Sequence, residues 1–323
     1  MAYLIKKYDD SRDFDIWEKF IDESSTNGTI FHSRKYLSYN KNKYIDSSIV
    51  IYKKELIISV LPCCKCGEKY FSYSGATLGG PVFSRYVENI GEISKIINLI
   101  LDYYGNKLEI RIGNSIYNEK YNNDIIYLLS KKLNIKLEIS WIFEVNDNFI
   151  DSIKNIRNKK NFIKMIDKEN GYTCKKYETI EDYKSFYNLL ENILLNKYNK
   201  KPTHTLDELL LLKLILNSNI NLYMVKDSVN NIYGGVIVIN VTKTCWYTIY
   251  IAKNINYNSS TNVSIMYIMY EIIMEAKQNG IKYIDYGVTS ENEGDKLNEG
   301  LSNYKEKSLC GKPIHRYLLL NCI

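Results

Sequence analysis

Residues 220–252 contain three apolar runs, which read INLYMVK (220–226), IYGGVIVIN (232–240) and CWYTIYIA (245–252). Each run is expected to form a β-strand. The polar stretches between them, residues 227–231 and 242–244, have the length of hairpin turns. This part of the chain therefore predicts three successive strands joined by tight turns.

Regular elements continue on both sides of these strands. Towards the N-terminus, hydrophobic periodicity predicts a strand and two helices, at 172–177, 180–195 and 206–216. Towards the C-terminus, the predicted elements are a long helix ended by Gly280, a strand, a helix and a last strand, at 263–279, 282–286, 296–305 and 314–320. The order β-α-α-β-β-β-α-β-α-β predicts an α/β fold of the α+β type with a mixed sheet.

The first half of the chain has a looser version of the same mixture. A helix is predicted at 14–24, a hairpin at 48–63, and alternating helices and strands at 92–145. We interpret the chain as two similar halves in tandem, of which the C-terminal half is the more complete. The expected divisions are 1–150, a basic connecting helix at 151–169, and 170–323.

Length and composition restrict the class of protein. A chain of 323 residues with 45% hydrophobic residues can bury a sizeable core and fits two domains. Its net charge of +6 makes an anionic ligand plausible and does not indicate a protein that coats nucleic acid or binds DNA stably. The first thirty residues lack the apolar stretch of a signal peptide, and no apolar run reaches membrane-spanning length, so we expect a soluble cytoplasmic protein.

The seven cysteines are expected to be structural or incidental thiols. Cys63, Cys64 and Cys66 lie close together, but they have neither the two-residue gap nor the second ligand pair of a zinc site. We therefore expect no metal.

Four stretches, in this order, resemble the FemAB-type branch of the GNAT acyltransferase superfamily. They are FHS at 31–33 with Tyr36, SGATLGGP at 74–81, KPTHT at 201–205, and residues 283–306, which include YIDYG, LNEGL and YKE. The resemblance spans nearly the whole chain. It implies two GNAT-like halves, each a mixed sheet with helices on both faces, and an enzyme that acylates amino groups of peptidoglycan precursors or other cell-envelope building blocks.

The chain departs from the family pattern in two places. The aromatic-Lys pair is present as Tyr304-Lys305, but Lys307-Ser308-Leu309 replaces the Gly-Phe-Gly that usually follows it. Sustained heptads are also absent, so the coiled-coil insertion of several bridge enzymes is missing. These departures separate the chain from the enzymes that act on lipid-linked precursors and leave the acceptor open.

Acyl transfer to an amine needs a base and donors that stabilise the oxyanion. His204 lies in a loop before a helix that Thr205 can cap, and it is a candidate base, with Glu299 as the alternative. Asp285 is expected at the C-terminal edge of a sheet strand, and Lys305 near the oxyanion. For each residue the alternative is structural: a loop hydrogen bond for His204, a loop cap for Asp285, and a solvated helix end for Lys305.

Further side chains are expected to bind substrate. These are His32, Ser33, Tyr36, Gly79, Arg157, Lys201, Tyr250 and Tyr304. Gly79 lies in a glycine-rich loop that either cradles a diphosphate or makes a tight structural turn. Arg157 shares one face of the connecting helix with Lys154, Lys164 and Lys168, opposite Ile156, Ile163 and Ile166. This face suits a phosphate clamp for a nucleotide sugar, a docking surface for a tRNA acceptor stem, or a solvated face over a buried stripe.

The acyl donor is expected to bind where residues Ser259, Ser260, Thr261 and Asn262 precede the long helix. A helix N-terminus attracts anions, and in GNAT enzymes the coenzyme A pyrophosphate binds there. Residues 252–262 contain no glycine, however, so an ordinary helix cap is the alternative interpretation.

The sequence therefore favours an N-acyltransferase that moves an acyl group from an acyl-CoA type donor to an amino group of an envelope or glycan precursor, such as an amino sugar. The acceptor is expected to be a small or nucleotide-linked amine held between the halves. One alternative is a Fem-type enzyme that uses aminoacyl-tRNA, and the second is a non-catalytic binding protein on the same fold.

Overall fold

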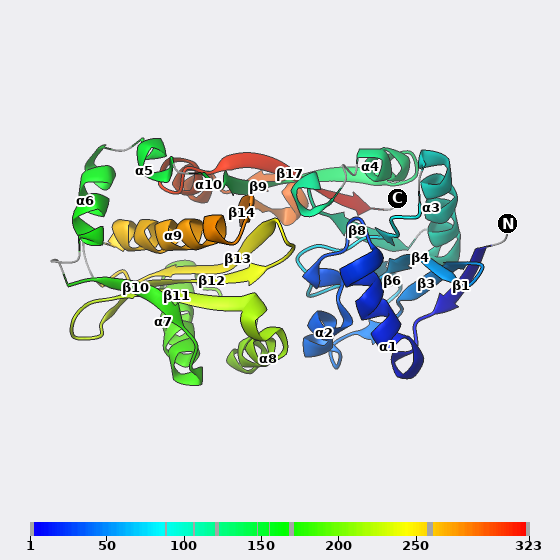
Figure 1. Cartoon of the computed structure of the whole chain (residues 1–323), viewed down its shortest axis with the longest axis horizontal. Helices are drawn as coiled ribbons and strands as arrows, with labels where there is room; N and C mark the ends of the chain where they lie inside the picture. Colours follow the sequence, from blue (N-terminus) through cyan, green and yellow to red (C-terminus); the bar gives the residue numbers. More distant parts are fainter. Residues whose placement is uncertain are drawn as a thin grey trace. The chain divides into compact units, whose positions relative to one another are not determined.

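The computed structural model describes residues 3–87, 89–105, 107–119, 123–146, 148–154, 156–167, 171–256 and 261–320 (Figure 1). Its α-helices are α1 (Asp10–Lys19), α2 (Arg34–Leu37), α3 (Ile90–Tyr104), α4 (Asn123–Ser130), α5 (Phe149–Ser152), α6 (Ile156–Ile166), α7 (Ile180–Tyr198), α8 (Leu206–Leu216), α9 (Thr261–Gln278) and α10 (Glu299–Lys307).

The strands of the first half and the long strand that follows are β1 (Tyr3–Lys7), β2 (Ile45–Asp46), β3 (Ile49–Lys53), β4 (Leu56–Leu61), β5 (Cys64–Cys66), β6 (Lys69–Phe71), β7 (Val82–Phe83), β8 (Leu108–Ile112) and β9 (Asn134–Glu144). The later strands are β10 (Thr173–Tyr177), β11 (Ile220–Lys226), β12 (Ile232–Asn240), β13 (Cys245–Lys253), β14 (Tyr283–Val288), β15 (Ser290–Glu291), β16 (Lys296–Leu297) and β17 (Lys312–Leu320). The expected α/β fold with mixed sheets is confirmed.

Most elements of the second half lie where the sequence predicts them, and α8, β11 and β12 match residue for residue. The helix predicted from residue 296 begins three residues later, at Glu299. The difference arises because β16 pairs with β15 and the side chain of Asn298 then caps α10 by accepting a hydrogen bond from the backbone N–H of Leu301 (3.0 Å).

The chain divides into two compact units that are not simple halves of the sequence. Unit 1 contains residues 1–139, 290–296 and 315–323, and unit 2 contains residues 140–289 and 297–314. Because β9 and β17 each run through both units, no single cut in the sequence separates them.

In unit 2 the strand order is β10-β11-β12-β13-β14-β9, and only the β13–β14 pair is parallel. Helix α9 lies on one face of these strands, and α7 and α8 lie on the other (Figure 1). Two adjacent glycines of β12 face these two helix layers, one on each side of the sheet. A Cβ on Gly234 would meet Ile265 of α9, whereas a Cβ on Gly235 would meet Phe186 of α7.

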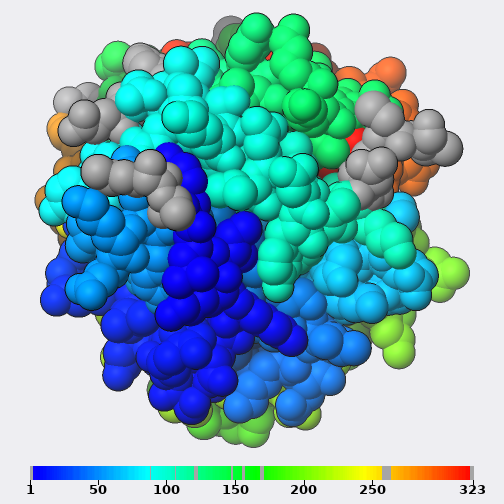
Figure 2. All heavy atoms as spheres, turned by 90° about the vertical axis from the view of Figure 1, so that its right-hand side faces the viewer, coloured from blue at the N-terminus to red at the C-terminus, as the bar shows by residue number. Residues whose placement is uncertain are grey.

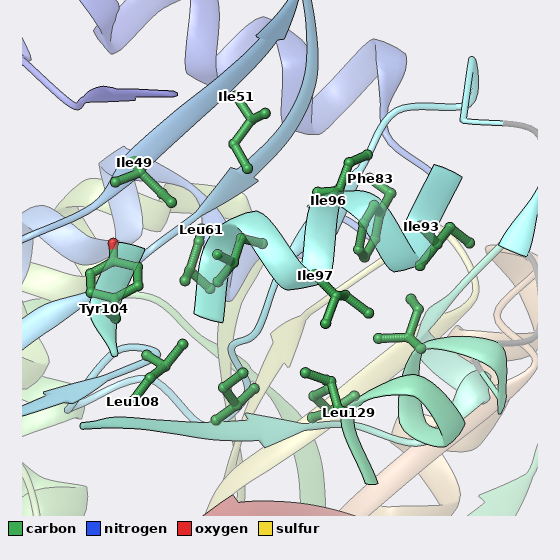
Figure 3. Packing of buried hydrophobic residues seen from close by; sticks show 14 of the residues in the cluster. Ile49, Ile51, Leu61, Phe83, Ile93, Ile96, Ile97, Tyr104, Leu108 and Leu129 are labelled. Carbon is green, nitrogen blue, oxygen red and sulfur yellow. The ribbon is translucent and has the colours of Figure 1, made fainter. Parts of the chain in front are cut away.

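In unit 1 strands β3 and β4 divide two apolar clusters, because alternate residues of a strand point to opposite faces. Ile49, Ile51 and Leu61 face the larger cluster, in which helix α3 packs on β8 and α4 (Figure 3). Val50 and Val60 face a smaller cluster around Trp17. The C-terminal strand also contributes to the larger cluster, through Leu319.

The N-terminal segment differs from the helix predicted at 14–24. Residues 3–7 form an edge strand that pairs with β3, and α1 starts at Asp10, where the Asp9 side chain caps it. A π-helical turn, Phe20–Ser24, then completes the predicted span. Figure 2 shows this N-terminal segment in dark blue on the surface of unit 1.

Candidate functional site

The parallel strands β13 and β14 pair over three residues only, from Cys245 opposite Tyr283 to Tyr247 opposite Asp285. Both strands continue beyond this point, to Lys253 and Val288. Where a strand no longer pairs with its neighbour, its buried backbone N–H and C=O groups need other hydrogen-bond partners. The point where the pairing ends is therefore where side chains of unit 2 have to hold the backbone.

Asp285 supplies one of these contacts. Its side chain is fully buried, and its Oδ1 accepts hydrogen bonds from the hydroxyl of Ser140 (2.6 Å) and from the backbone N–H of Gly287 (2.6 Å). A buried carboxylate needs such donors, because burying the charge without them is costly. The carboxylate thus holds the strand from inside unit 2, whereas the sequence suggested an edge position.

Lys305 of α10 holds the same glycine from its other side. The buried ammonium donates to the carbonyl oxygens of Gly287 (2.8 Å) and Val288 (3.2 Å). Strand β14 is irregular here, since its register with β9 shifts between Asp285 and Val288. Lys305 is therefore not part of a solvated helix end. The structure brings Asp285 and Lys305 together around Gly287.

Gly287 itself has a left-handed backbone, with φ of +81°. A Cβ at this position would lie 3.0 Å from the phenol oxygen of Tyr247. Glycine is therefore the residue that fits this turn of the strand without strain.

His204, which is buried, pairs with the half-buried Tyr250 of β13. The Tyr250 hydroxyl accepts the backbone N–H of His204 (3.0 Å) and lies 2.8 Å from its Nδ1. The backbone carbonyl of His204 accepts a third hydrogen bond, from Tyr187 (3.2 Å). Burial raises the pKa of Tyr250 to about 12, so this phenol stays protonated at neutral pH. The expected cap by Thr205 is confirmed, because its hydroxyl accepts the backbone N–H of Glu208 (3.2 Å).

Glu299 and Lys201 have different surroundings from these pairs. Glu299 is exposed at the first residue of α10, where an acid is favoured by the helix dipole. Lys201 is exposed in the loop before α8. Both side chains face solvent and lack the buried contacts of His204 and Asp285.

Tyr304 lies beside Lys305 on α10 with its hydroxyl buried. That oxygen has no hydrogen-bond partner among the described residues, and burial raises the pKa of the phenol. Tyr286, which interacts electrostatically with it, donates to the backbone carbonyl of Leu309 (3.1 Å).

Sequence reasoning missed a row of polar side chains that supports this region. The hydroxyl of Thr289 lies 2.9 Å from Trp141 Nε1 and 2.9 Å from the hydroxyl of Ser302, and Ser140 binds Asp285 as described above. Ser140 and Asp285 are 145 positions apart in the chain. No local pattern links them, so only the pairing of β9 with β14 reveals the contact.

The expected donor-binding segment is only partly described. Ser259 and Ser260 lie outside the described residues. Thr261 and Asn262 form the first turn of α9, and their side chains are not among those described.

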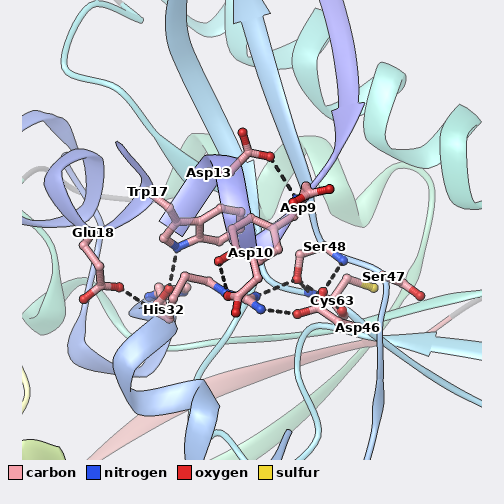
Figure 4. Close-up of polar contacts among 12 residues, drawn as sticks. Asp9, Asp10, Asp13, Trp17, Glu18, His32, Asp46, Ser47, Ser48 and Cys63 are labelled. Carbon is pink, nitrogen blue, oxygen red and sulfur yellow. Dashed lines mark hydrogen bonds and ion pairs between the residues drawn. The ribbon is translucent and has the colours of Figure 1, made fainter. Parts of the chain in front are cut away.

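In unit 1 three of the expected substrate-binding side chains make structural contacts. The backbone of His32 is held as well, because its carbonyl accepts the indole N–H of Trp17 (2.8 Å; Figure 4). His32 Nδ1 accepts the backbone N–H of Thr29 (3.1 Å), and the hydroxyl of Ser33 donates to Glu18 (2.9 Å). The hydroxyl of Tyr36 donates to the carbonyl of Gly75 (3.3 Å). These contacts fix the turn before α2 and the glycine-rich loop.

Gly79 also has a structural role. Its backbone N–H donates to the carbonyl of Arg111 on β8 (2.8 Å). A Cβ would lie 1.4 Å from the carbonyl oxygen of Ser72. The glycine is therefore required for close backbone approach, which favours the interpretation of this loop as a tight structural turn.

The buried imidazole of His32 predicts loss of stability in acid. Burial lowers its pKa from 6.5 to about 4. The unfolded chain takes up a proton near pH 6.5, but the folded chain does so only near pH 4. The free energy of unfolding should therefore fall by about 3 kcal/mol between these values.

Chemical denaturation at a series of pH values checks this expectation. His32→Asn is the matched variant, because its amide can still accept from Thr29 but does not titrate in this range. A wild-type pH dependence that survives unchanged in His32→Asn would assign the effect to other groups.

Arg157 is exposed on α6, together with Lys160 and Lys164. The stripe expected beneath it is partly wrong. Ile163 is 48% exposed, and Phe162 and Met165 are the buried side chains. The basic face is therefore solvated, and the helix packs through Phe162 and Met165.

Two properties of the described part of the chain bear on membrane and metal binding. None of its helices combines the length and apolar character needed to cross a membrane. Among the same residues, no three His, Cys, Asp or Glu side chains are grouped to hold a metal ion.

The fold is similar to that of the solved structure of FemX, which confirms the resemblance to FemAB-type proteins at the level of fold. The structure of FemX aligns with 99% of this chain and 98% of its own length, with a TM-score of 0.67 at 12% sequence identity. The C-terminal domain of a putative lysylphosphatidylglycerol synthetase from Agrobacterium fabrum aligns with 97% of this chain and 93% of its own length (TM-score 0.60, 9% identity). L-PGS from Bacillus licheniformis aligns with 82% of this chain and 81% of its own length (TM-score 0.55, 12% identity). No protein-family profile and no curated protein sequence matches the chain.

Proposed function

We propose that the chain is an N-acyltransferase whose chemistry takes place in unit 2. The observation that carries the proposal is the short parallel pairing of β13 and β14. It ends at Asp285, and Gly287 beyond it is held by a buried carboxylate on one side and a buried ammonium on the other. Such support holds in one conformation a backbone that has left its sheet partner, and a site for acyl transfer needs its groups fixed in this way.

The proposed roles follow from the contacts. His204, with its Nδ1 beside the Tyr250 phenol, is the preferred group to accept the proton of the attacking amine, directly or through that phenol. Asp285 and Lys305 act through Gly287 as positioning residues. Glu299 is the alternative base, supported by its exposure to solvent at the start of α10.

The proposed acceptor is an amino group on a cell-envelope or glycan precursor, such as an amino sugar, in the cytoplasm. Coenzyme A thioester is one candidate donor, with the first turn of α9 as its binding position. Aminoacyl-tRNA is the second candidate, favoured by the likeness to FemX over nearly the whole chain and by the exposed cations Arg157, Lys160 and Lys164 of α6.

One experiment can identify both the acyl donor and the acceptor amine. Purified protein is incubated with a panel of amino sugars and nucleotide-linked amines, together with either acetyl-CoA or charged tRNA, and products are detected by intact mass. Acyl transfer from the thioester that resists ribonuclease supports the first donor, and transfer abolished by ribonuclease supports the second. If neither donor gives product or shifts the thermal unfolding midpoint, the result contradicts the proposed acyltransferase and favours a non-catalytic binding protein.

Tyr250→Phe tests the proposed base. The change removes the hydroxyl beside His204 Nδ1, so kcat should fall about 10- to 100-fold while KM changes little. Tyr198→Phe, at a 51% exposed ring on α7, is the matched control and should keep wild-type kinetics. A Tyr250→Phe enzyme with wild-type kcat would remove the His204–Tyr250 pair from the mechanism.

A further inference from the structure

The short strand β5 places two cysteine side chains on one face of unit 1. Cys64 and Cys66 are two positions apart, and alternate residues of a strand share a face. The Cys64 and Cys66 thiols interact directly with each other. Cys63 belongs to the opposite face, where it lies in the apolar cluster with Tyr104. The arrangement is therefore a pair of thiols and not a group of three.

Ser74 contacts both sulfur atoms. Its backbone N–H donates to Cys64 Sγ (3.2 Å), and its hydroxyl lies 3.8 Å from Cys66 Sγ. The residue that opens the glycine-rich loop therefore holds both sulfurs on the same side of β5.

The backbone of β5 opposes a disulfide between these residues. Two steps along a strand separate their Cα atoms by about 6.6 Å, near the upper limit for a disulfide. Side chains on one face of a strand also run parallel, whereas a disulfide needs Cβ atoms about 3.8 Å apart. An ion placed between the sulfurs spans this gap without moving the strand.

We propose that Cys64 and Cys66 form a two-thiolate site for a soft monovalent metal ion of the Cu(I) class. Thiolates select soft ions, and Zn²⁺ and iron–sulfur clusters need more protein ligands than this pair supplies. Within the described residues no third Cys, His, Asp or Glu completes a larger set. Cu(I) accepts two sulfur ligands in a linear arrangement, which suits two parallel side chains.

The site also has a deep end and an accessible end. Cys64 is fully buried, whereas Cys66 is partly exposed. An ion can therefore be received at Cys66 and retained by Cys64. Binding replaces the two thiol protons with one cation, and no oxidant or reductant is consumed.

Competition with a coloured chelator tests the proposal. The reduced full-length chain is titrated without oxygen into the Cu(I)–bicinchoninate complex, and loss of its colour measures transfer. Wild type should remove one equivalent of Cu(I), and Cys66→Ser should weaken retention at least tenfold. Cys63→Ser and Cys310→Ser, which keep the pair intact, should behave as wild type.

Because Cys66 is partly exposed, Cys66→Ser should fold, and an unchanged thermal unfolding midpoint checks this. Native mass spectrometry with Ag(I), which is inert to redox change, provides the second measurement and should show one bound ion in wild type and none in Cys66→Ser. Equal copper retention by wild type and Cys66→Ser would overturn the site, as would loss of retention in Cys63→Ser. A Cys64–Cys66 disulfide formed under mild oxidation would also overturn it.

Discussion

Gly79→Ala is expected to prevent the chain from reaching a stable fold. The added Cβ would lie 1.4 Å from the backbone oxygen of Ser72, and a backbone atom cannot move aside as the end of a side chain can. Relief requires breaking the hydrogen bond from Gly79 N–H to the Arg111 carbonyl, which joins the loop to β8. We expect a loss of at least about 4 kcal/mol, measured by chemical denaturation or seen as insoluble expression.

Gly105→Ala is the matched control for this change. Gly105 also lies in unit 1 and has a left-handed backbone (φ +61°), but a Cβ added there would have no other atom within 4 Å. Gly105 has a ψ of −159°, in a backbone region essentially confined to glycine, so only a conformational cost of about 1–3 kcal/mol should be seen. If both variants lost the same stability, the close approach to Ser72 would not be the cause.

Asp285→Ala is expected to have the second largest effect. Without the carboxylate, the hydroxyl of Ser140 and the backbone N–H of Gly287 lose a buried acceptor, at about 1–3 kcal/mol each. The free energy of unfolding should fall by about 3 kcal/mol or more. Transferase activity should fall on the order of a hundredfold, because a displacement of about 1 Å at the reacting centre has this effect.

Asp285→Asn separates the two effects. Its amide oxygen still accepts hydrogen bonds, so most of the stability should return, as measured by denaturant titration. Activity that also returns to wild type would show that the charge has no role beyond holding Gly287. Full stability in Asp285→Ala would contradict the structural account.

Helix α8 and strands β11 and β12 were predictable to the residue because local signals agree there. Thr205 and Glu208 cap α8, and both strands are long apolar runs bounded by turns. The edge strand β1 has only five residues, its apolar residues are consecutive, and Leu4 is exposed, so periodicity alone does not reveal it. Strand β1 is defined by its pairing with β3, which the sequence pattern does not indicate.

The candidate site was predictable only as a set of residue types. Lys305 could be singled out from its family-like stretch, but its burial against Gly287 depends on how α10 packs. His32 lies in a similarly family-like stretch, yet its imidazole caps a turn. In α6, apolar residues occupy more than one stripe, so periodicity could not decide that Phe162 and not Ile163 is buried.

The division of unit 1 among separate segments affects how the protein is made. The larger cluster that contains Leu108 and Ile110 also contains Leu319, more than two hundred positions later. A ribosome therefore has to add more than two hundred further residues after Leu108 before this cluster can close, and contacts between such distant positions form slowly. Until Leu319 has been synthesised, apolar side chains of the early segments stay exposed to solvent. The partly synthesised chain is therefore most prone to aggregation and to binding by chaperones.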